Sequence, residues 1–141
     1  MVTIDHPRTK LASSLDIVDD VHAVVAAQLG RRLAIELGFS LVEQTALSTA
    51  ILEITRNIVK YAGKGKISIS EMYHAGKNGI LIVASDQGPG IPDIGLALKD
   101  GFSTGRSLGL GLPGARRLMD TFDIVSQVGQ GTTVTMGKWK S

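Results

Sequence analysis

The stretch ALSTAILEITRNIVKYAG, residues 46–63, carries a carboxylate and an amide four positions apart. In a helix, Glu53 and Asn57 point the same way, at the edge of a stripe of leucine and isoleucine that faces the core. A glutamate can take a proton from a hydroxyl group, and an asparagine oxygen suits Mg²⁺. The pair therefore indicates one rim of a reactive cleft, although the same pattern also describes a polar pair on a partly exposed helix.

A second candidate is DQGPGIPD, residues 86–93, which follows the apolar run ILIVAS. Asp86 at the end of a strand can accept a hydrogen bond from an exocyclic amine such as N6 of adenine. Gly88 and Gly90 lack a Cβ and would let a flat base approach the backbone. The alternative is an Asp-Gly-Pro turn with no ligand.

Two glycine-rich stretches complete the set. GRSLGLGLPG, residues 105–114, leads into the expected helix ARRLMDTF, residues 115–122, whose first N–H groups and positive dipole end suit phosphate. The stretch has no G-K-[ST] sequence and no preceding strand, so it is neither a Walker A loop nor a dinucleotide fingerprint, and a flexible loop is the alternative. The glycines of GQGTT, residues 129–133, are explained by a turn between two strands. The hydroxyl of Thr132 could nevertheless reach a base through water.

Alternating and helical patterns predict the elements that must hold these residues. Ser40 and Glu43 form a capping box at the start of the second helix, which should run to about Ala62. The element order is β-α-α-β-β-α-α-β-β. It predicts an α+β two-layer sandwich with a mixed, mostly antiparallel sheet and helices on one face. The expected strands are 14–20, 66–72, 79–86, 123–128 and 132–139, and the expected helices are 21–37, 41–62, 93–101 and 115–122.

Composition narrows the classes of protein. The 141 residues suffice for one domain, expected at 14–141 after a flexible N-terminal lead at 1–13. No cysteine is present, which removes disulfides, thiol nucleophiles and cysteine-bound zinc and fits a cytoplasmic protein. The sequence has neither a membrane-length apolar run nor the apolar core of a secretory signal at its start. Its basic residues are scattered and only 4% of residues are aromatic, so no nucleic-acid surface is expected.

The order of these motifs resembles the GHKL (Bergerat-fold) ATP-binding superfamily over residues 15–140. This superfamily includes gyrase-type ATPases and the catalytic domains of histidine kinases. One branch of this superfamily is especially similar in sequence: the RsbT-type serine/threonine protein kinases of the stressosome, which are relatives of the anti-sigma-factor kinases. The segments that carry this similarity are TRNIVKYAGKG, DQGPGIPD, DGFST and GLPGARRLMD.

The resemblance implies roles for individual residues. Glu53 would be the general base, and Asn57 would hold Mg²⁺ with Lys60 near the phosphates of ATP. Asp86 would bind adenine, and Thr132 would support the base. The pocket around adenine would be shaped by Gly88, Gly90 and Ile91.

Residues 103–111 would form a lid over the triphosphate. Many relatives have a glycine doublet where this chain has Arg106 and Ser107, which leaves three roles open for Arg106: contact with the γ-phosphate, contact with a partner, or stiffening of the lid. The lid positions expected to touch the nucleotide are Thr104, Gly105, Arg106, Leu108, Gly109, Leu110 and Gly111.

The activity implied by the resemblance is transfer of phosphate from ATP to a serine or threonine of a STAS-domain protein of the RsbS or RsbR type. The kinase would then activate a PP2C-type phosphatase similar to RsbU, which ultimately frees an alternative sigma factor. A different class of function is a nucleotide-gated binding module with little or no chemistry, and a free-standing ATPase is a third. A sensor histidine kinase is disfavoured, because no expected pair of dimerisation helices carries an acceptor histidine.

Overall fold

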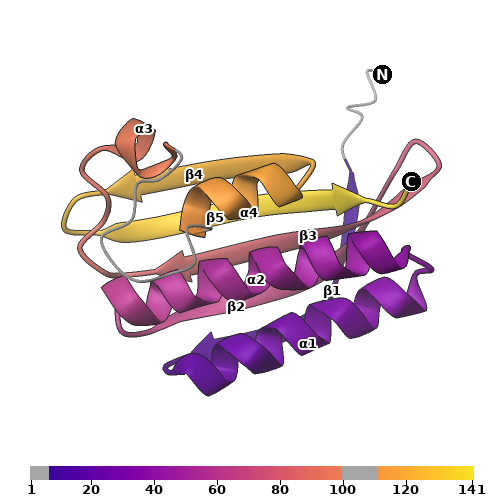
Figure 1. The fold of residues 1–141 in the computed structure, drawn as a ribbon, viewed down its shortest axis with the longest axis horizontal. Helices are drawn as coiled ribbons and strands as arrows, with labels where there is room; N and C mark the ends of the chain where they lie inside the picture. Colours follow the sequence, from indigo (N-terminus) through magenta and orange to yellow (C-terminus); the bar gives the residue numbers. More distant parts are fainter. Residues whose placement is uncertain (1–6, 100–110) are drawn as a thin grey trace, which may run out of the picture.

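The computed structural model describes residues 7–99 and 111–141, which form an antiparallel sheet covered on one face by helices (Figure 1). The strands lie in the order β1-β2-β3-β5-β4, so that β1 and β4 are the two edges. In chain order the elements are β1 (Arg8–Ile17), α1 (Asp20–Glu36), α2 (Leu41–Tyr61), β2 (Gly65–His74), β3 (Lys77–Asp86), α3 (Ile94–Ala97), α4 (Gly111–Leu118), β4 (Thr121–Gln127) and β5 (Gly131–Trp139).

The predicted α+β two-layer class is confirmed, with α1, α2 and α4 on the same face of the sheet (Figure 1). The expected mixed sheet is antiparallel at every strand pair of the described residues. The β1–β2 pair is antiparallel because two helices connect these strands. The chain runs back along the sheet in α1 and returns in α2, so β2 runs opposite to β1. None of the helices described is both long and apolar enough to cross a membrane.

Helix α2 supplies the centre of the core. The apolar stripe expected on this helix is buried, and it packs with alternate isoleucines of β2 and β3 in one cluster. Leucine and isoleucine at helical spacing thus meet isoleucine at strand spacing, which is how a helix packs on a sheet. The buried stripe consists of Leu47, Ile51, Ile54 and Ile58.

The first strand begins earlier than the sequence predicted. It starts at Arg8 rather than Ser14, so residues 8–13 belong to the sheet and not to the expected N-terminal lead. Arg8 pairs with Tyr73 near the far end of β2. Pairing with this long neighbouring strand overrides the weak apolar alternation of residues 8–13.

The fourth helix also lies earlier than predicted, at Gly111–Leu118 instead of 115–122. Pro113 is compatible with this start, because a helix tolerates proline in its first turn, where N–H groups have no partner within the helix. The helix ends before Phe122, which pairs with Met136 as part of β4 and packs against the core. Strand pairing and packing of the aromatic ring against the core therefore outweigh continuation of the helix.

The start of α2 is tied to the end of the chain. The Ser40 hydroxyl accepts the Glu43 N–H at 3.1 Å, and the Glu43 carboxylate accepts the Ser40 N–H at 2.8 Å, which confirms the predicted capping box. The same carboxylate accepts the Ser141 N–H at 2.9 Å. Desolvation raises the pKa of Glu43, but hydrogen bonds from the backbone and side chains of Ser40 and Ser141 outweigh it and lower the pKa from 4.5 to about 2.

We expect Glu43→Gln to destabilise the fold by about 1 kcal/mol at pH 7, because the charged acceptor of these N–H groups is lost. The folded pKa lies below the ordinary value, so the contribution is complete above about pH 4.5 and disappears as the pH falls towards 2. Urea unfolding of both proteins from pH 7 to pH 3 measures the difference. A difference in free energy of unfolding that stays the same as the pH falls would contradict this account. Glu36→Gln at the exposed end of α1 is the control.

Candidate active site

Helix α2 presents Glu53 and Asn57 one turn apart. Glu53 is only 9% exposed, whereas Asn57 is half-buried. A buried carboxylate needs a hydrogen-bond partner, and Glu53 Oε2 accepts the Gly111 N–H at 3.1 Å. Gly111 is the first residue of α4, so the carboxylate lies at the positive end of that helix.

The C-terminal part of α2 lies against the end of β3. A Cβ placed on Gly65 would be 2.8 Å from Ile58 Cγ2 and 3.2 Å from the Cβ of Asp86. One turn later, Ala62 packs on the next loop, since a Cβ on Gly88 would lie 2.6 Å from the Ala62 Cβ.

Glu53 lies close, along the helix axis, to the part of α2 that contacts the end of β3. Ile58 follows Glu53 by five residues, which is about 7.5 Å of helix axis. The C-terminal end of α2 and the end of β3 lie on the same side of the molecule (Figure 1). The structure therefore brings Glu53, Asn57 and Asp86 to one end of the sheet.

Asp86 and Thr132 are directly opposed on the neighbouring strands β3 and β5. Opposed residues have Cβ atoms about 5 Å apart on the same face of a sheet. Asp86 Oδ1 accepts the Gly88 N–H at 2.8 Å, which is the Asp-Gly turn weighed as an alternative for DQGPGIPD. Because a carboxylate has two oxygens, this turn leaves acceptor capacity for an amine of a ligand.

The loop that follows Asp86 is held by the β4–β5 hairpin. The Ile91 N–H donates to Ser126 Oγ at 2.7 Å, and the Gly129 N–H donates to the Pro89 carbonyl at 2.8 Å. Ser126 was not among the residues predicted for the site. Its signal in the sequence is its place in DIVSQV, where alternation puts it on the same inward face as Ile124.

The two predicted glycines of this loop make close packing contacts. Gly88 lies against α2, as described above, and Gly90 has a φ of +78° with its α-carbon against the backbone of Gln127. Their neighbours in the structure are thus protein segments that enclose the loop on two sides. Neither position accepts a Cβ without displacing α2 or the hairpin.

Lys60 is exposed, and its ammonium group lies 5.1 Å from the ring centroid of Tyr61, a cation–π distance. Of the predicted lid, Gly111 is described and contacts Glu53. The other lid positions fall outside the described residues: Thr104, Gly105, Arg106, Leu108, Gly109 and Leu110.

The residues around Asn57 show how the expected magnesium ion could be held. The described residues contain no group of three or more histidine, cysteine or acidic side chains that could hold a metal ion. Mg²⁺ commonly keeps several waters and takes only one or two protein ligands together with phosphate oxygens. The Asn57 oxygen thus fits Mg²⁺ as one ligand of a nucleotide-bound ion, and not as part of a protein cage.

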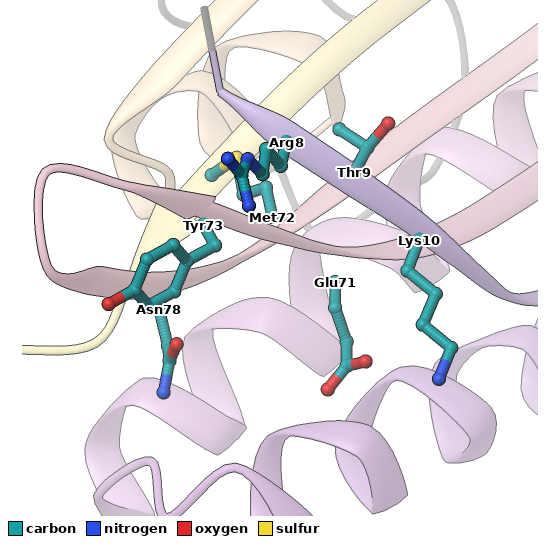
Figure 2. A pocket seen from close by; sticks show the side chains of 7 residues that line it. All are labelled: Arg8, Thr9, Lys10, Glu71, Met72, Tyr73 and Asn78. Atoms are coloured by element: carbon teal, nitrogen blue, oxygen red, sulfur yellow. The ribbon is translucent and has the colours of Figure 1, made fainter.

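A pocket of about 230 Å³ lies at the opposite end of the sheet, between β1, β2 and β3 (Figure 2). Tyr73 and Asn78, which pair there, are about eight residues along the strands from Gly65 and Asp86, or roughly 26 Å. Figure 2 shows the side chains of Lys10 and Glu71 pointing to the same side of the sheet. The pocket is smaller than most sites for drug-sized ligands, which start near 300 Å³.

Residues 42–140 match the family of histidine kinase-, DNA gyrase B- and HSP90-like ATPases. The chain belongs to this family, so the predicted superfamily is confirmed. The chain is also 51% identical over 127 residues to the serine/threonine-protein kinase RsbT of Bacillus subtilis (strain 168), covering 90% of this chain and 96% of RsbT, which confirms the predicted branch.

The fold agrees with that of a solved structure, the mycobacterial sensor histidine kinase MprB. The TM-score is 0.54 at 16% identity, and the match covers 97% of this chain and 98% of that one. At this identity the likeness shows the fold alone.

The β4–β5 turn offers a matched pair of glycines for testing how tightly the site is built. Gly129 and Gly131 both have positive φ, at +81° and +123°. A Cβ at Gly131 would overlap the backbone oxygen of Asp86, whereas a Cβ at Gly129 meets no atom within 4 Å. We expect Gly129→Ala to cost about 1 kcal/mol from backbone strain alone, and Gly131→Ala to cost roughly 3 kcal/mol or more.

Thermal and urea unfolding of the two alanine variants measure this difference. Equal losses of stability would show that β5 does not press against Asp86.

Proposed function

We propose that this protein is an ATP-dependent serine/threonine kinase whose nucleotide binds at the end of the sheet formed by Asp86 and Thr132. The observation that carries the proposal is the approach of α2 to this end, which sets the buried Glu53 within about two helical turns of the Asp86 contact. The similarity to a serine/threonine-protein kinase over nearly the whole chain supports the reaction class.

The base of ATP would be recognised by Asp86, whose carboxylate accepts a hydrogen bond from the N6 amine. Thr132 on the opposed strand would contact the base directly or through water. Gly88, Gly90 and Ile91 would form the wall of this subsite, held in place by α2 and the hairpin.

The phosphates would extend from the base towards Asn57, Lys60 and the start of α4. Mg²⁺, when bound with ATP, neutralises charge on the phosphate oxygens, and Asn57 would be its protein ligand. Arg106 and the other expected lid residues would close over the triphosphate.

Glu53 would act on the protein substrate. In the transfer, the serine or threonine oxygen forms a bond to the γ-phosphorus, the bond to the β–γ bridging oxygen breaks, and ADP leaves. The hydroxyl proton passes to the Glu53 carboxylate. Oε2 accepts the Gly111 N–H, which restrains the orientation of the carboxylate and leaves Oε1 to accept the hydroxyl proton.

The substrate would be a STAS-domain protein of the RsbS or RsbR type, and a PP2C-type phosphatase similar to RsbU would be the second partner, in the cytoplasm. Neither nucleic acid nor a membrane is expected as a partner. These assignments follow from the similarity to RsbT and from the motifs of the sequence.

A second candidate is a nucleotide-gated binding module. The Glu53–Gly111 hydrogen bond supports it, because the same contact would couple α2 to the position of α4 without any proton transfer. The two candidates differ in what Glu53 does, so they can be separated by changing that residue.

We expect Glu53→Gln to lower the rate of phosphate transfer to a STAS-domain protein by about 10²- to 10⁴-fold with little change in ATP affinity. Glutamine keeps an oxygen that can accept the Gly111 N–H but cannot serve as the base. Mass spectrometry of phosphoserine and phosphothreonine after incubation with Mg-ATP measures the transfer. Transfer at the wild-type rate would remove Glu53 from its catalytic role, and no transfer by the wild-type protein would favour the binding module; Glu36→Gln is the control.

Asp86→Asn tests the base subsite. The asparagine oxygen can still accept the Gly88 N–H, so the turn is preserved while the charged acceptor for the amine is lost. We expect ATP to bind about 10- to 100-fold more weakly. The shift in melting temperature caused by Mg-ATP should shrink accordingly, and an equal shift in the two proteins would show that Asp86 does not bind the base.

A further inference from the structure

Ser126 on β4 joins three segments that meet around the proposed base subsite. Its hydroxyl is part-buried and accepts the Ile91 N–H at 2.7 Å. The same oxygen lies 2.7 Å from the hydroxyl oxygen of Thr132 and 3.2 Å from the carbonyl oxygen of Gly131. One side chain of the edge strand thus contacts both the loop after Asp86 and the residue opposite Asp86.

The number of hydrogens limits how these contacts can be made together. A serine hydroxyl has one hydrogen and two acceptor lone pairs, and the Ile91 N–H occupies one lone pair. When Ser126 donates to the Gly131 carbonyl, Thr132 must donate to Ser126, and Thr132 then offers a ligand only lone pairs. When Ser126 donates to Thr132 instead, the Thr132 hydrogen is available to a ligand acceptor.

We propose that Ser126 is a positioning residue for nucleotide binding, which acts by setting the direction of the Thr132 hydroxyl and by anchoring the Ile91 amide. The inference rests on the proposed function. In the arrangement where Ser126 donates to Thr132 at 2.7 Å, and not to the Gly131 carbonyl at 3.2 Å, the hydrogen of Thr132 is turned to the ligand next to Asp86, which accepts. This donor–acceptor pair is complementary to an amine beside an unprotonated ring nitrogen, as on adenine. Guanine presents a carbonyl beside a protonated nitrogen, which opposes both groups.

The anchoring of Ile91 is the second part of the same role. Ser126 and Ile91 are 35 residues apart in the chain, and their hydrogen bond fixes the loop of residues 86–93 against the hairpin. A second hydrogen bond, from the Gly129 N–H in the β4–β5 turn to the Pro89 carbonyl, holds the same loop against the hairpin. Loss of the Ser126 hydroxyl would leave the Ile91 N–H without its acceptor and the Thr132 hydroxyl without its partner, and each change weakens a preorganised site.

Ser126→Thr and Ser126→Val form a matched pair for the test. Both are β-branched residues of similar size that suit a strand, and they differ only in the hydroxyl. We expect Ser126→Thr to bind ATP nearly as the wild type does, and Ser126→Val to bind about 10-fold or more weakly, by isothermal titration calorimetry. In transfer assays, Ser126→Val should raise KM for ATP with little change in kcat. The ratio of the affinity for ATP to that for GTP should also be smaller in this variant.

A double-mutant cycle with Thr132→Val measures whether Ser126 acts through Thr132. We expect the affinity loss of the double variant to be smaller than the product of the two single losses, because both changes break one shared hydrogen bond. Ser70→Val on β2, away from this end of the sheet, controls for replacing a half-buried strand serine by valine. Thermal unfolding shows whether each variant is folded, and Ser126→Ala, which adds no atoms, repeats the comparison where valine is not accommodated.

The outcomes separate the inference from the proposed function. Equal ATP affinities of the valine and threonine variants, or losses that multiply in the double variant, would overturn the positioning role while leaving ATP binding intact. No binding of ATP by the wild-type protein would overturn the proposed function and the inference with it. A tenfold loss confined to the variants without the hydroxyl, together with a less-than-multiplicative cycle, supports the role of Ser126.

Discussion

The burial of one face of α2 against the sheet is the constraint on which the site depends. Each isoleucine of the stripe contributes about 1.5–3 kcal/mol by leaving water, so the rotation of the helix about its axis is fixed by the core. Once that rotation is fixed, the positions at the edge of the stripe are fixed too. Glu53 then meets the start of α4, and Asn57 lies one turn further along the same side.

The other wall of the site is fixed by small residues and hydrogen bonds more than by apolar burial. Gly65 allows α2 and Asp86 to approach each other, and Gly131 allows β5 to pass close to the Asp86 carbonyl. Ser126 and the hairpin turn then hold the loop that follows. Because hydrogen bonds depend on direction, this wall defines where a polar ligand edge can lie with more precision than a packed apolar surface would.

Much of this architecture could be predicted from local patterns. The capping box at Ser40, the apolar stripe of α2 and the two hairpins are recorded within short stretches of sequence, and all of them are found in the structure. The errors fell where distant contacts decide the outcome. Strand β1 starts early because β2 offers a partner, and α4 ends early because Phe122 pairs within β4 and packs against the core.

The same distinction applies to the site. Glu53, Asn57, Asp86 and Thr132 could be selected because their spacing and order form a motif, although their roles remain proposals. The hydrogen bond between Glu53 and Gly111 joins residues 58 apart, and no periodicity records it. Ser126 could be placed on the inward face of its strand by alternation, but its partners depend on strand order and on the path of the loop.

In the proposed function, helix α2 would link base recognition to chemistry in a single rigid element. Its last turns touch the Asp86–Gly88 segment, while Glu53 two turns earlier holds the first amide of α4. A nucleotide whose base is fixed at one end of this helix would have its phosphates directed along a defined path past Asn57. In phosphate transfer most of the catalytic effect comes from alignment and charge stabilisation, so the rigidity of the helix that spans the two subsites is itself a part of the proposed mechanism.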